Sequence, residues 1–136
     1  MPVRGGPTDD EALSLAQMMG RRYKACVEAI HVIQVKRDLP IDADMSIEIE
    51  AAEKLLDDVE RRLEGSETQI ESSLLQARDV GAAIVDEAVQ TRADAIVLGV
   101  PYKRKFGEYA VGQVAQYILK NAPCLVCVVR QPAEAP

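Results

Sequence analysis

The chain has 136 residues, which is enough for one domain with its own core. Its composition, 48% apolar and 28% charged residues, is that of a globular protein rather than a disordered chain. The net charge of -6 argues against nucleic acid as a partner, because phosphate binding needs a basic face. No segment reaches the ~18 apolar residues of a membrane-spanning helix, so we expect no direct membrane insertion.

Only three residues precede Arg4, whereas a central strand usually needs about 5. We therefore expect an excised domain or a late start site, with further sequence upstream. Apolar residues then recur at helical spacing, which predicts a helix from Thr8 to Gly20. Asp9 and Asp10 fall in its first turn, where the helix dipole favours negative charge.

The middle of the chain continues the alternation of strands and helices. Residues 26–33 are mostly apolar and β-branched, which predicts a buried parallel strand. We interpret the single histidine in it, His31, as a hydrogen-bonded core residue rather than a ligand or base. An apolar stripe predicts a helix over 47–63, and its charged residues form i,i+4 pairs on a wet surface. Residues 68–75 predict a half-exposed strand near a sheet edge.

The last third predicts a helix over 80–88, a strand over 95–98, a helix after Gly112 and a strand over 125–129. Strands that alternate with helices indicate an α/β sheet covered on both faces. Cys124 and Cys127, three apart at this last strand, should point to opposite faces, so we interpret them as structural rather than as a redox or metal site. We expect one domain over residues 1–131 and a disordered tail over 132–136.

Two glycines of the last third match a known spacing. Gly99 and Gly112 take the first and third glycine positions of the pattern Gly-x2-Gly-x9-Gly-Ser/Thr, while Tyr102 and Gln113 replace the second glycine and the hydroxyl residue. Together with the opening PVRGGPTDDEALSLA and the ending NAPCLVCVVR, this pattern resembles the universal stress protein family. The resemblance covers nearly the whole chain. It implies a five-stranded, mostly parallel open sheet, Rossmann-like and of the adenine nucleotide alpha hydrolase type, with a central first strand and two helices on each face.

The resemblance also implies a site for adenine nucleotide that is altered here. Arg4 stands where ATP-binding members carry aspartate, Tyr102 replaces a glycine and Gln113 replaces serine. These changes fill the cleft and remove phosphate contacts, so we expect no tightly bound cofactor, and ATP or AMP only at low affinity. We expect no catalytic and no metal-binding residues. The candidate nucleotide-binding residues are Val3, Arg4, Val32, Leu98, Gly99, Tyr102, Gly112, Gln113 and Val114.

By the same resemblance, the chain is expected to be a regulatory, sensor or interaction module. It would lie in the cytoplasm or on the cytosolic face of a membrane protein, such as an amino-acid permease carried in cis. The alternative is a free-standing ATP- or AMP-binding stress protein. A slow ATPase is less favoured, because no nucleophile–base pair is visible. The basic run Lys103–Lys105 is interpreted as a solvated loop, with anion binding as the alternative.

The strand over Leu125–Val129 has an uninterrupted apolar sequence at the end of the chain. An exposed apolar edge invites pairing with another strand. We therefore expect a homodimer in which two copies of this strand pair across a two-fold axis.

Overall fold

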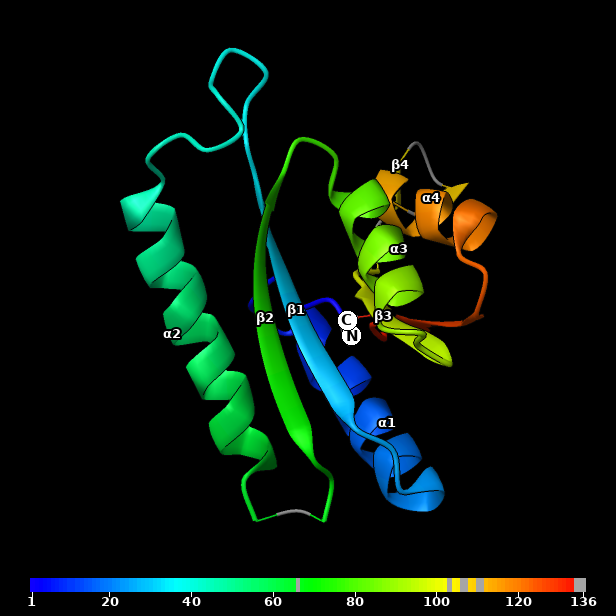
Figure 1. Cartoon of the computed structure of the whole chain (residues 1–136). Coiled ribbons are helices and arrows are strands. Elements are labelled where there is room, and N and C mark those ends of the chain that lie inside the picture. The colour runs from blue at the N-terminus through cyan, green and yellow to red at the C-terminus, as the bar shows by residue number, and fades with distance from the viewer. Residues whose placement is uncertain (66, 103, 106–107, 110–111, 134–136) are drawn as a thin grey trace.

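The computed structural model describes residues 1–65, 67–102, 104–105, 108–109 and 112–133. Helices and strands alternate along the chain, as Figure 1 shows. The helices among these residues are α1 (Thr8–Tyr23), α2 (Ser46–Leu63), α3 (Val80–Gln90) and α4 (Gln113–Asn121). The strands are β1 (Val27–Gln34), β2 (Ile70–Ala77), β3 (Ala95–Val100), β4 (Arg104–Lys105), β5 (Glu108–Tyr109) and β6 (Leu125–Arg130).

The longer strands form two parallel pairs. β1 pairs with β2 from Val27–Ile70 to Gln34–Ala77, and β3 pairs with β6 over six residues. The short strands β4 and β5 form a separate antiparallel pair. The α/β class with parallel strands is thus confirmed, but the described residues form four longer strands in two sheets, not the single five-stranded sheet that we expected.

The expected first strand is reduced to a short stretch beside β1. Pro2 forms one parallel bridge to Ile30. The Val3 amide donates to the Ile30 carbonyl (2.8 Å), and the Ile30 amide donates to the Met1 carbonyl (2.9 Å). The ladder on this edge of β1 therefore runs only as far as Val3, because the chain turns away at the following loop.

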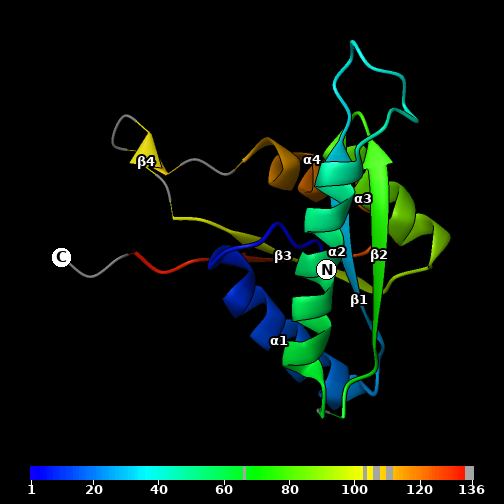
Figure 2. The ribbon, with the colours of Figure 1, turned by 90° about the vertical axis from the view of Figure 1, so that its left-hand side faces the viewer.

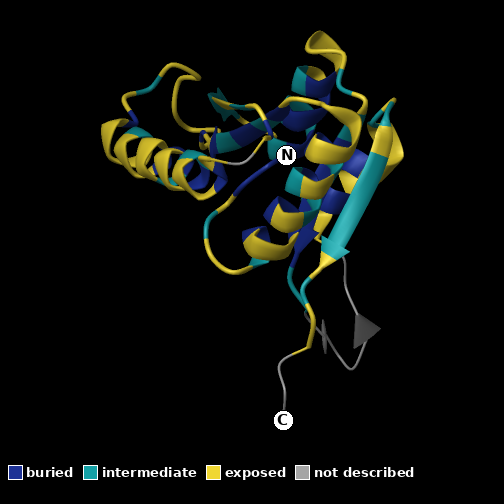
Figure 3. Ribbon diagram, turned by 90° about the horizontal axis from the view of Figure 1, so that it is seen from below, coloured by how far each residue is buried: buried dark blue, intermediate teal, exposed yellow. Residues whose placement is uncertain are grey.

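Helices cover both faces of the strands. One core cluster joins β3 to α3 and α4 through Ile84, Leu98 and Ile118. On the other face, α1 and α2 pack on β1 around Leu13, Ala29 and Leu56. Figures 1 and 2 show α2 across the β1–β2 pair from α3 and α4. Figure 3 shows the buried side of the helices turned toward the strands.

The two cysteines of the last third lie on different faces, as predicted. Cys124 packs against the cluster of α3 and α4, whereas Cys127 packs against the cluster of α1. Both are free thiols. No helix in the described part of the chain is long and apolar enough to cross a membrane.

Candidate functional site

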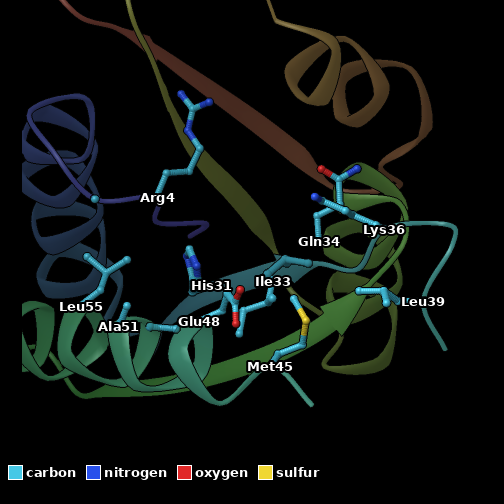
Figure 4. Close-up of a pocket in the computed structure, with 13 residues that line it drawn as sticks. Arg4, His31, Ile33, Gln34, Lys36, Leu39, Met45, Glu48, Ala51 and Leu55 are labelled. Atoms are coloured by element: carbon cyan, nitrogen blue, oxygen red, sulfur yellow. The ribbon is translucent and has the colours of Figure 1, made fainter. Parts of the chain in front are cut away.

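A cleft of about 640 Å³ lies between α2 and the carboxyl-terminal half of β1. Figure 4 shows the side chains that reach into it from both elements and from the loop that begins at Arg4. The cleft lies beside the part of β1 that follows Ile30, beyond the hydrogen bonds that join Ile30 to Met1 and Val3. It is lined by Arg4, Gly5, His31, Val32, Ile33, Gln34, Lys36, Leu39, Met45, Glu48, Ala51, Ala52 and Leu55.

One side of α2 forms a wall of this cleft. Its lining residues, Glu48, Ala51, Ala52 and Leu55, are spaced i, i+3, i+4 and i+7, so they lie on one helical face. Ala52 also packs with Ile33 in a buried cluster that anchors the helix to β1. The two alanines have short side chains, so the backbone of α2 can approach β1 while space for a ligand remains.

The opposite wall is the loop at Arg4, and a buried carboxylate holds it. Asp9 is only 6% exposed. It accepts from the Gly5 amide at 2.7 Å and from the Arg4 amide at 3.1 and 3.2 Å. Gly5 and Gly6 have φ of 89° and 85°, a conformation that side chains with a Cβ rarely adopt. The loop therefore turns sharply at the end of the Met1–Val3 ladder and presents Arg4 to the cleft.

Sequence reasoning missed this role of Asp9 and assigned it only to the helix dipole. A signal was present, because Asp9 follows two consecutive glycines and a proline, and such a turn leaves amide groups in need of an acceptor. The partner of those amides depends on how α1 folds back on the loop, which residue spacing does not reveal.

On the edge of β1 next to this loop, some backbone groups have no partner among the residues that the structure describes. Odd-numbered residues of β1 direct their backbone groups toward β2. The Val27 amide, at the start of β1, donates to the Gln69 carbonyl just before β2, and the Val35 amide, just after β1, donates to the Ala77 carbonyl. Even-numbered residues direct theirs to the opposite edge, where Ile30 bonds to Met1 and Val3. Among the described residues nothing continues this ladder past Ile30. The amide and carbonyl of Val32 therefore face the cleft as a donor and an acceptor side by side.

His31 is held by a hydrogen bond, as predicted, yet it is not enclosed in the core. Its Nδ1 lies 2.8 Å from the Val3 carbonyl oxygen, and the residue is half-buried among those that line the cleft. Because a carbonyl can only accept, Nδ1 carries the proton, and Nε2 of the neutral ring is an acceptor.

Two predicted residues of β3 lie in the core. Leu98 is buried against α3 and α4. Gly99 faces α1 so closely that a Cβ on it would overlap the Thr8 carbonyl oxygen. This contact alone requires glycine at position 99, whether or not a ligand binds nearby.

Tyr102 follows β3, and its ring is covered by the Arg130 guanidinium at 4.9 Å from the ring centre. Such a cation–π contact favours one position of the ring. Tyr102 thereby links the end of β3 to the end of β6. The side chains of the basic run Lys103–Lys105, for which we weighed anion binding, lie outside the described residues.

The start of α4 holds the remaining predicted residues. Gly112 is the N-cap of α4, with φ -64° and ψ 159°, and no side chain of the described residues caps the helix. A Cβ on Gly112 would meet nothing within 4 Å. Gln113 is exposed and Val114 is half-buried against the cluster of α3 and α4. Of the nine predicted site residues, Arg4 and Val32 line the cleft, and the carbonyl of Val3 bonds to His31 of the cleft. The other six lie in β3, just after β3 and at the start of α4.

The comparisons with known proteins agree with this architecture. A profile described as "Universal stress protein family" matches residues 1–130. A universal stress protein of Methanocaldococcus jannaschii is 29% identical over 97% of this chain and 81% of its own length.

Among solved structures, the universal stress protein of Archaeoglobus fulgidus in complex with dAMP has a TM-score of 0.74 at 19% identity. The match covers 94% of this chain and 93% of that one. A family protein of Arabidopsis thaliana with AMP bound has a TM-score of 0.64 at 19% identity and covers 93% and 81% of the two chains. At such identities these structures show a shared fold. The profile match over almost the whole sequence shows more, namely that the chain belongs to the universal stress protein family.

Proposed function

We propose that this chain is a regulatory module that senses adenine nucleotides, with the base bound on the open edge of β1. The observation that carries the proposal is the amide and carbonyl of Val32 beside the cleft, for which the described part of the chain supplies no backbone partner. Adenine presents a donor and an acceptor next to each other, the N6 amino group and a ring nitrogen. This pair complements the carbonyl and the amide of Val32, so the base would continue the ladder where the chain leaves it. Complexes of family relatives with AMP and dAMP support this choice of ligand.

In our proposal the site binds the phosphate groups of the nucleotide only weakly. Tyr102 places a Cβ and a ring, held by Arg130, where the family pattern has a flexible glycine. Gln113 lacks the hydroxyl of the serine that it replaces. Each change costs an estimated 1–3 kcal/mol of phosphate binding, from the scales for overpacking and lost hydrogen bonds. Two such losses would move a micromolar site toward millimolar affinity. The nucleotide is bound and not consumed in this proposal.

Calorimetric titration of the purified protein with ATP, ADP and AMP tests the proposal. We expect weak binding of all three, with ATP no tighter than AMP. Combining Arg4→Asp, Tyr102→Gly and Gln113→Ser should restore phosphate contacts and raise ATP affinity. Low-micromolar ATP binding by the unchanged protein, or ATP retained through purification, would instead favour a free-standing ATP-binding stress protein.

A regulatory module needs a partner, and β6 is our candidate for the contact. Within the described residues β6 pairs with β3 on one edge only, and Leu125 is 62% exposed. Two copies pairing through β6 would satisfy the free backbone groups and cover this side chain. We also propose a cytoplasmic location, free or attached in cis to the cytosolic face of a transporter.

A further inference from the structure

The cleft carries two hydrogen-bond acceptors that the base would leave unused, one on β1 and one on α2. The first is Nε2 of His31, because the bond from Nδ1 to the Val3 carbonyl determines which nitrogen is protonated. The ring cannot turn over without losing this bond. Nε2 is thus a placed acceptor on the α2 side of β1, one residue from the proposed base contact at Val32.

The second acceptor is Glu48. Of the four α2 residues that line the cleft, it alone is charged, and the other three are Ala51, Ala52 and Leu55. Glu48 is exposed, and neither of the two salt bridges found among the described residues involves it. Figure 4 shows His31 and Glu48 projecting from β1 and α2 toward the same part of the cleft, with Arg4 on the other wall.

We propose that His31 and Glu48 bind the two ribose hydroxyls of the nucleotide and make the site specific for ribonucleotides. This inference rests on the proposed function and assigns residues to its sugar. A vicinal diol offers two O–H donors, and the neutral imidazole and the carboxylate offer two acceptors. The same pair offers phosphate no positive charge, so it selects for the sugar and not for the phosphate.

The chemistry also predicts how strongly the site prefers a ribonucleotide over an analogue without the ribose hydroxyls. A site built to accept from a hydroxyl rejects an analogue without it, because its own polar groups then lose their partner. Each hydrogen bond of this kind contributes on the order of 1 kcal/mol net, which is about fivefold in affinity, and the dideoxy analogue loses both. We therefore expect AMP to bind about thirtyfold more tightly than 2′,3′-dideoxyadenosine monophosphate.

The test measures both ligands by calorimetry on the full chain and on three variants. Glu48→Ala removes one acceptor. His31→Asn can keep an N–H donor near the position of Nδ1 for Val3 but lacks Nε2. Glu53→Ala is the matched control, since Glu53 is an exposed glutamate of α2 outside the cleft. Thermal melting of each variant checks that the fold is intact.

In Glu48→Ala and His31→Asn we expect the preference for AMP to fall several-fold while the affinity for the dideoxy compound stays the same. Glu53→Ala should keep the full preference. A purely structural role of Glu48 or His31 would weaken both ligands equally and would refute the assignment. Equal binding of the two ligands by the unchanged protein would refute it as well, while leaving the proposed function intact. Absence of binding by both ligands would overturn the two proposals together.

Discussion

Substitution of Gly99 separates its packing role from the ligand role that the glycine pattern suggests. A Cβ at this position would overlap the Thr8 carbonyl oxygen and would lie 3.2 Å from the Thr8 carbonyl carbon and 3.4 Å from the Ala12 Cβ. The obstacle is backbone of α1, which no rotamer change can move. In Gly99→Ala, α1 must therefore shift away from β3.

The shift would loosen a helix whose Ala12, Leu13 and Ala16 are all less than 5% exposed. Overpacking of a core lowers its stability by about 1–3 kcal/mol. A gap of about 0.5–1 Å between packed atoms loses about a quarter to a half of the dispersion energy of each contact. We expect Gly99→Ala to lower the free energy of unfolding by about 3 kcal/mol, near the upper end of the range for overpacking. This is a large fraction of the stability of a small domain and lowers the melting temperature by about 10 °C.

Urea unfolding followed by circular dichroism measures this loss, and Gly112→Ser is the matched control. Gly112 is the other glycine of the pattern, has room for a Cβ and occupies an N-cap, where serine is favoured. The control should match or slightly exceed the wild-type stability. A Gly99→Ala protein within about 0.5 kcal/mol of wild type, the range of neutral surface substitutions, would refute the packing argument.

Three further predictions concern the loop, the helix α3 and the proposed dimer. Asp9→Asn should cost about 2 kcal/mol, because one amide oxygen replaces a carboxylate that accepts from two backbone amides. Asp10→Asn, which breaks only a surface pair with Arg62 at 3.0 Å, should cost less than about 1 kcal/mol in the same unfolding assay. Burial, then a hydrogen bond and the charge of Glu28, raise the pKa of Glu87 above its ordinary 4.5, so its ionisation opposes folding. Glu87→Gln should therefore stabilise the protein at neutral pH and lose this advantage below pH 4.5, and equal gains at both pH values would contradict the assignment. Light scattering at micromolar concentration should give twice the mass of one chain, and Val128→Pro, which places a residue without an N–H in β6, should give a single chain. A dimer that survives this substitution would exclude β6 as the interface.

The sequence predicted the elements well because their signals are local. The apolar stripe of α2 and the β-branched run of β1 follow from spacing alone. The opposite placement of Cys124 and Cys127 followed from strand alternation in the same way. These features depend on neighbours along the chain, which the sequence displays directly.

The sheet and the cleft were predicted less completely because they depend on contacts between distant segments. The continuous sheet was expected from the family, whereas Pro2 supplies only one bridge to Ile30. The cleft needs α2 to pack on β1, and the glycine at 99 is required by α1, which folds back from the other end of the chain. His31 was correctly predicted to be hydrogen-bonded, but its exposure to the cleft follows from the end of the ladder at Val3.

The most direct test of the central claim is a nuclear magnetic resonance titration of the isotope-labelled protein with AMP. If the base binds the open edge of β1, the amide resonance of Val32 should shift most, with Gln34 and His31 following, as AMP reaches millimolar concentration. The amides of Val27 and Val35, which bond to the β2 side, should change little and serve as internal controls. Shifts confined to other parts of the protein, or no shifts at all, would contradict the placement of adenine nucleotide on β1.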